Sequence, residues 1–208
     1  MTPHRFRSFV FAAAVALSLA GCAFYAPVGP GAHAIQGKLD VTLDSTWNRQ
    51  VDGASNIWPE TWTRNGPLLD TVHLAPGIEE GKALVNLPEN ALREYPRYRA
   101  GSSPTDIVAF VQGTLARTVA ASDFELVEVA PAEVAGHSGI RFEFRFGAGN
   151  QGSFETDRHA LGYAFERDKQ LYLLLFHAAE IHYFAAGKPA FEAIVASARL
   201  PQVRAAAR

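Results

Sequence analysis

The sequence has 208 residues, enough for one domain with short appendages. Apolar residues make up 48% and charged residues 19%, which excludes a chain that is disordered throughout. A formal net charge of -2 gives no electrostatic reason to expect nucleic acid as a partner. One cysteine excludes an internal disulfide and the paired-thiolate sites of zinc ribbons and iron–sulfur clusters.

The N-terminus has the pattern of a secretory signal peptide. Arg5 and Arg7 form a short basic region, an apolar stretch follows over 9–19, and small residues come next. The stretch is shorter than the ~20 residues that cross a bilayer comfortably, and the prolines and glycines of 27–31 prevent its continuation as a helix. We therefore predict a signal peptide over 1–21, with an uncleaved membrane anchor as the alternative.

The string Leu19-Ala20-Gly21-Cys22 resembles the lipobox of bacterial lipoproteins. The resemblance implies that the Cys22 thiol receives a diacylglyceryl group, that cleavage occurs before it, and that the new amine is acylated. Several acyl chains anchor a protein stably, since each buried methylene contributes about 0.8 kcal/mol. Ala23 stands where the inner-membrane retention signal of enteric bacteria is aspartate, which implies the periplasmic face of the outer membrane. The alternatives are a chance cysteine near an ordinary cleavage site and an inner-membrane anchor.

The remaining chain divides by composition into a tether, one domain and a tail. Residues 22–37 are rich in Pro, Gly and Ala, which predicts the lipidated cysteine followed by a flexible tether. A single α+β domain is expected over 38–200. The tail over 201–208 is expected to fray.

The first half of the domain shows a strand, a hairpin and an irregular excursion. Alternating apolar residues predict a strand over 39–43. A hairpin is predicted over 61–74 around an Asn-Gly turn. Residues 76–102 lack periodicity, apart from one expected helical turn near 90–94.

The clearest helix signal begins at Pro104. Ser103 is a suitable N-cap, Pro104 suits the first helical position, and Asp106 stands where a capping-box acid belongs. An apolar stripe then continues along the segment. The sequence therefore predicts a helix over 104–120.

The second half is rich in strand signals and ends in a helix. The expected strands are 124–129, 137–146, 160–165 and 171–176, and the expected helix is 189–198. Over 137–146, Ile and Phe alternate with charged residues, so one face of this strand is expected in the core. The run over 171–176 is apolar on both faces, which predicts a central, doubly covered strand.

This order of elements predicts an α+β fold, a mostly antiparallel sheet packed with helices. The sequences GIRFEFRF, LGYAFERDKQLYLLLF and PAFEAIVASARL give a strand meander followed by a helix. In this layout the domain is similar to the PsbP-like sandwich. The resemblance implies a non-catalytic accessory or assembly factor, and it identifies no catalytic residue and no cofactor.

Two groups of residues are candidates for binding. Arg93, Tyr95, Arg97, Tyr98 and Arg99 interleave the side-chain types that are enriched at binding hot spots, which predicts contact with an envelope protein or glycan. The alternative is a surface loop whose tyrosines pack on their own domain. The three tryptophans of the chain are expected in packing, with a sugar platform as the alternative.

Catalytic signals are weak. The sequence has no G-x-S-x-G elbow. His177, Glu180 and His182, with His159 on a neighbouring strand, are the candidates for a zinc site, although their convergence at a strand end is not expected.

The sequence therefore predicts a membrane-anchored periplasmic lipoprotein with a non-catalytic binding, accessory or assembly role, neither an enzyme nor a metal protein. One alternative is a carrier or sensor of an apolar small molecule, with a cavity lined by Phe110, Phe142, Phe144 and Leu173. The other is a metal-dependent hydrolase that uses the histidine cluster.

Overall fold

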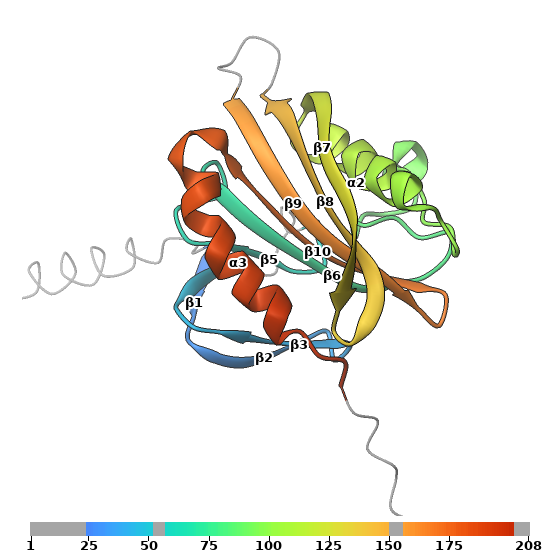
Figure 1. Cartoon of the computed structure of the whole chain (residues 1–208). Coiled ribbons are helices and arrows are strands. Elements are labelled where there is room, and N and C mark those ends of the chain that lie inside the picture. The colour runs from blue at the N-terminus through green and yellow to red at the C-terminus, as the bar shows by residue number, and fades with distance from the viewer. Residues whose placement is uncertain (1–23, 52–56, 150–155, 202–208) are drawn as a thin grey trace, which may run out of the picture.

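The molecule is built on one long antiparallel sheet with a helix on each face (Figure 1). A computed structural model describes residues 24–51, 57–149 and 156–201. The strands of the main sheet lie in the order β1-β4-β5-β6-β10-β9-β8-β7, and β2 and β3 form a separate hairpin. Their bounds are β1 Tyr25–Val28, β2 Gly31–Ile35, β3 Leu39–Leu43, β4 Trp47–Gln50, β5 Thr61–Thr63, β6 Asp70–Ile78, β7 Ala121–Val134, β8 His137–Ala148, β9 Thr156–Arg167 and β10 Gln170–Ala179. The helices are α2 Pro104–Thr118 and α3 Ala185–Ser197, with short turns at η1 Ala91–Glu94 and η2 Glu180–Phe184.

The meander from β7 to β10 forms half of the sheet, and its four predicted strands are confirmed. Each is longer than the apolar pattern indicated, because strand pairing continues through residues outside the apolar stretches that the sequence analysis used. The run over 171–176 lies in β10 between β6 and β9 and is buried throughout, as predicted. Alternation along β8 is also confirmed, since Ile140, Phe142, Phe144 and Phe146 all belong to the core beneath α2.

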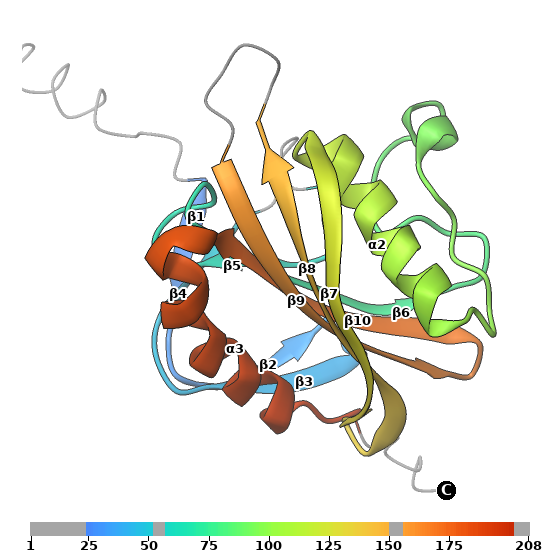
Figure 2. The same cartoon turned by 45° about the horizontal axis from the view of Figure 1, so that its top comes forward.

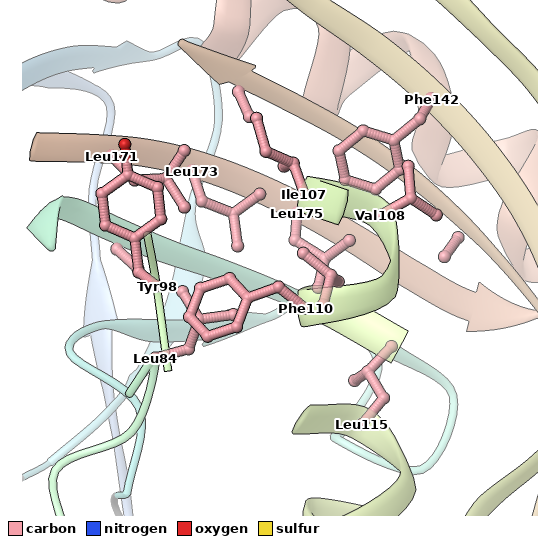
Figure 3. Packing of buried hydrophobic residues seen from close by; sticks show 14 of the residues in the cluster. Leu84, Tyr98, Ile107, Val108, Phe110, Leu115, Phe142, Leu171, Leu173 and Leu175 are labelled. Atoms are coloured by element: carbon pink, nitrogen blue, oxygen red, sulfur yellow. The ribbon is translucent and has the colours of Figure 1, made fainter. Parts of the chain in front are cut away.

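Helix α2 covers one face of the sheet, and its start is fixed locally. The Ser103 side chain accepts a hydrogen bond from the Asp106 N–H at 3.2 Å, and the Asp106 carboxylate accepts one from the Ser103 N–H. This is the predicted capping box. Val111 and Leu115 of α2 are fully buried against the sheet, and Figure 3 shows Leu115 within this apolar core.

Helix α3 covers the opposite face, together with the β2–β3 hairpin (Figure 2). Phe191, Ile194 and Val195 are buried there, as predicted, but α3 begins four residues before the expected Pro189. A kink at η2 precedes it, where His182 has a φ of 69°. Its position depends on packing, because no side chain caps its N-terminus.

The prediction of a flexible tether over 22–37 is wrong for most of its length. Strand β1 pairs with β4, and β2 pairs with β3. Pro27 fits in β1 because that strand lies at the edge of the sheet, where a missing N–H need not interrupt a ladder. Composition alone did not separate an edge strand from a tether. The signal peptide, Cys22 and residues 202–208 lie outside the described residues.

The first half of the domain contributes four further strands to the two sheets. The 39–43 strand is confirmed as β3, and the hairpin as β5 and β6, joined through residues 64–69. Strand β4 was not predicted. The expectation that the tryptophans pack is confirmed, since Trp47, Trp58 and Trp62 are 1%, 4% and 1% exposed. Within the described residues, neither helix is long and apolar enough to cross a membrane.

Candidate functional site

The two tyrosines of the 93–99 segment pack on their own domain. Tyr98 is 2% exposed and belongs to the core beneath α2, where its hydroxyl donates a hydrogen bond to the Glu166 carboxylate. Tyr95 is partly buried against the same core. The alternative that the tyrosines pack on their own domain therefore agrees with the structure.

The three arginines of the segment have different surroundings. Arg93 and Arg99 are exposed. Arg97 is half-buried, and its guanidinium lies 2.9 Å from the carboxylate of Glu89. The five side chains therefore do not form one exposed binding surface, and contact of Arg93 or Arg99 with a partner stays a prediction.

The candidate metal ligands do not converge. His177 lies on the α2 side of the sheet, whereas His159 lies on the α3 side, where its ring stacks on Phe184 at 3.8 Å. Glu180 forms an ion pair with Arg145, and His182 is exposed. Across the described residues, no three His, Cys, Asp or Glu side chains are grouped to hold a metal ion. The structure therefore offers no geometry for the metal-dependent hydrolase alternative.

The residues proposed to line an apolar cavity instead fill the α2-side core. Phe142, Phe144 and Leu173 are fully buried, and Phe110 is 7% exposed. All four belong to one packed cluster, and Figure 3 shows Phe142, Leu173 and Phe110 among its members. A carrier function would therefore need a pocket with other lining residues.

A buried polar network lies at one end of this core, and we call it the Arg158 network. The Arg158 guanidinium contacts His177 Nδ1 through Nε at 3.1 Å and Nη2 at 2.9 Å, and its Nη1 donates to the Leu68 carbonyl at 2.6 Å. His177 Nε2 lies 3.3 Å from His73 Nε2. This series of hydrogen bonds ends at Thr61, whose hydroxyl lies 3.1 Å from His73 Nδ1.

One arrangement of protons satisfies this network. Because Arg158 can only donate, His177 Nδ1 accepts, and its proton lies on Nε2. His177 then donates to His73 Nε2, so the His73 proton lies on Nδ1 and points to the Thr61 oxygen. Both imidazoles are neutral in this arrangement, and each nitrogen has a partner.

Burial keeps the two imidazoles neutral. It lowers the pKa of His73 to about 3, with a further lowering by the charge of Arg158. Burial also lowers the pKa of His177 well below its usual value, and the charge of Arg158 acts in the same direction. Trp58 stacks on the His73 ring at 4.0 Å and closes the network from one side.

Arg158 is a buried cation whose contacts are neutral. The residue is 5% exposed, and burial lowers its pKa to about 10, so it stays charged at neutral pH. The Asp70 carboxylate opposes this lowering from a distance but accepts hydrogen bonds from Thr63 and Asn65. Among the described residues, no carboxylate forms an ion pair or hydrogen bond with Arg158.

A surface pocket of about 710 Å³ opens beside this cation, between the C-terminal end of α2 and the sheet. We call it the α2-end pocket. Its described lining includes Leu68, Val119, Ala148, Arg117 and Arg158. This volume lies within the usual range of small-molecule sites.

Sequence reasoning missed the Arg158 network because the strand was expected to begin at residue 160. Strand β9 in fact begins at Thr156. Arg158 therefore shares the core-facing side of the strand with Ala160, as the period of two requires. Arg158 stands two positions before Ala160, and this spacing could have indicated that its side chain faces the core. The pairing of His73 with His177 required the strand order, which the sequence did not provide.

Comparisons with known proteins identify the fold. No family model and no curated protein matches the sequence. The solution structure of cyanobacterial PsbP (CyanoP) from Synechocystis sp. PCC 6803 matches with a TM-score of 0.51 and 15% identity, over 88% of this chain and 96% of that chain. A crystal structure of LpqN, involved in cell envelope biogenesis of Mycobacterium tuberculosis, matches with a TM-score of 0.43 and 11% identity, over 85% and 90%. The first likeness shows a PsbP-like fold, as the element order predicted.

Proposed function

We propose that this chain is a lipid-anchored envelope protein whose domain has a non-catalytic binding role at the periplasmic face of the outer membrane. The observation that carries the proposal is the Leu19-Ala20-Gly21-Cys22 string directly after a signal-like apolar stretch. Cys22 is the only cysteine, so no other sulfur chemistry competes for it.

The geometry of the domain favours binding over catalysis. A general base must reach substrate with a free nitrogen or oxygen and a pKa near the working pH. His73 and His177 are buried, and both ring nitrogens of each form hydrogen bonds. Burial also lowers the pKa of both imidazoles. They serve instead as fixed neutral neighbours of the Arg158 cation.

The anchor would be short. Strand β1 begins at Tyr25, and the Phe24 carbonyl already accepts a hydrogen bond from the Val51 N–H. The three residues after Cys22 can extend about 10 Å at most. The β1 edge of the sheet would therefore lie close to the lipid surface.

The experiment is intact-mass analysis of protein purified from its native host. The expected mature chain begins at Cys22 and carries a diacylglyceryl group and one further acyl chain. Cys22→Ser is expected to leave an unprocessed precursor of full length. Mature protein with an unmodified Cys22, or a Cys22→Ser protein that is cleaved before residue 22 like the parent, would contradict the proposal.

A matched variant tests which of the two membranes holds the anchored protein. Ala23→Asp leaves the acceptor cysteine intact, so processing and lipid mass are expected to be unchanged. Sucrose-gradient separation of the two membranes should then show a shift of the anchored protein toward the inner membrane. The same distribution for both proteins would contradict the outer-membrane part of the proposal.

A further inference from the structure

The described lining of the α2-end pocket is basic and apolar. Arg117 and Arg158 contribute positive charge, and none of its described lining residues is Asp or Glu. Arg117 is half-exposed and forms an ion pair with Glu94 at 3.2 Å. The charge of Arg158 is therefore the one that lacks a contacting carboxylate within the described part of the chain.

Burying a cation without a paired anion is unfavourable, because the group loses its hydration. Three neutral acceptors offset part of this cost, namely His177 Nδ1, the His177 carbonyl and the Leu68 carbonyl. They also fix the plane of the guanidinium. An oxyanion in the pocket would supply the missing countercharge and would meet a donor group that is already oriented.

The wall of the pocket beside Arg158 is apolar. Leu68 is 82% exposed, an unusual position for a leucine, and its own carbonyl binds the guanidinium. Val119, Ala120 and Ala148 provide further apolar surface. A ligand that fits both parts has an oxyanion at one end and an apolar body at the other.

We propose that the α2-end pocket binds an anionic amphiphile, with a carboxylate or phosphate head group against Arg158 and an aliphatic chain against Leu68. Nε and Nη2 of Arg158 are directed at His177 and one Nη1 N–H at the Leu68 carbonyl, so these contacts leave the second Nη1 N–H to donate to either head group. His177 lines the pocket and orients Arg158, and His73 is a positioning residue that acts through His177. The proposal concerns the domain and does not depend on lipid at Cys22, which the mass analysis tests separately.

The test is a calorimetric titration of the full chain carrying Cys22→Ser with three probes. Octanoate and octyl phosphate have the two head groups, and octanol has the same chain without charge. We expect saturable binding of at least one anion, about tenfold or more tighter than octanol. The tighter anion identifies the head group. Equal binding of the anions and octanol, or no saturable binding of either anion, would overturn the proposal.

Two exposed leucines provide matched variants that leave the core unchanged. Leu68→Glu places a competing carboxylate at the pocket, and we expect it to weaken anion binding about tenfold. Leu126→Glu makes the same change on β7 at a residue that does not line the pocket, and it should bind like the parent. Since all variants share the N-terminal segment, probe binding to that segment cancels in the comparison. Equal affinity of the two variants would overturn the proposed site.

Discussion

The two faces of the sheet compensate their buried charges differently, as Glu143 on one face and Arg158 on the other illustrate. On the α3 side, the Glu143 carboxylate lies 3.0 Å from Lys188 Nζ and 2.9 Å from Arg141 Nη2. On the α2 side, Arg158 contacts neutral nitrogen and carbonyl acceptors. One face therefore contains a compensated charge and the other a cation open to a ligand.

This difference separates a structural network from a binding site. Burial alone would raise the pKa of Glu143, but hydrogen bonds from Lys188 and Arg141 hold it below its usual value. Its network links β8 to α3 and needs no external ion. The Arg158 network ends at a pocket, and its histidines stay neutral chiefly because burial removes their hydration, with repulsion by Arg158 acting in the same direction.

The largest expected effect is a loss of stability in mild acid that comes from the α2 side. His73 has a pKa of about 3 in the folded state and about 6.5 when unfolded, so the unfolded chain binds more protons below pH 6.5. The free energy of unfolding should fall by about 1.4 kcal/mol per pH unit, or about 3 kcal/mol by pH 4.5, for this residue alone. His177 adds in the same direction, and His159 on the α3 side, whose pKa is lowered by burial, makes a further contribution. Urea unfolding at several pH values measures the slope.

Two variants test whether the Arg158 network causes this dependence of the free energy of unfolding on pH. His177→Gln keeps an acceptor for Arg158 and a donor for His73 but cannot titrate, so it should reduce the slope. His182→Asn removes an exposed imidazole at a positive φ, which asparagine tolerates, and should leave the slope unchanged. The Glu143 contribution appears only below its usual pKa of about 4.5, outside this window. A flat stability between pH 6.5 and 4.5 would rule out neutral buried histidines.

The next effect concerns the compensated face. Glu143→Gln keeps the shape of the side chain but leaves Arg141 and Lys188 without their shared anion, and should cost about 2 kcal/mol. Glu128→Gln removes the more exposed partner of Arg141 and should cost less than about 1 kcal/mol. Thermal and urea unfolding of both variants at pH 7 provide the measurement. Equal losses would show that burial of Glu143 contributes nothing beyond a surface ion pair.

The sequence predicted the parts of the fold that local patterns determine. The alternation of apolar and charged residues in β8 and the apolar run of β10 each indicated how many faces are buried. The Ser103–Asp106 pair located the start of α2. These features depend on neighbours along the chain, which is why a single sequence was sufficient.

The features of the fold and the site that the sequence did not predict depend on residues far apart in the sequence. β1 and β4 are short and lie at or near the sheet edge, so pairing with each other identifies them better than composition does. The Arg158 network joins β5, β6, β9 and β10, and His73 and His177 lie 104 positions apart. For the 93–99 segment, the alternative that its tyrosines pack on their own domain agrees with the structure, but the partner of the Tyr98 hydroxyl, the Glu166 carboxylate on β9, could not be read from the sequence.

The smallest expected effect concerns the two helices, because α2 has a side-chain cap at its N-terminus and α3 has none. Ser103→Ala removes the side-chain acceptor for the Asp106 N–H and should destabilise the protein by about 1 kcal/mol. Ser102→Ala is the matched control, since this exposed hydroxyl bonds only the Arg99 carbonyl and caps no helix. Hydrogen exchange should show faster exchange in the first turn of α2 and no change in α3, which has no side-chain cap to lose. Equal acceleration in both helices would mean that α2, like α3, depends on packing alone.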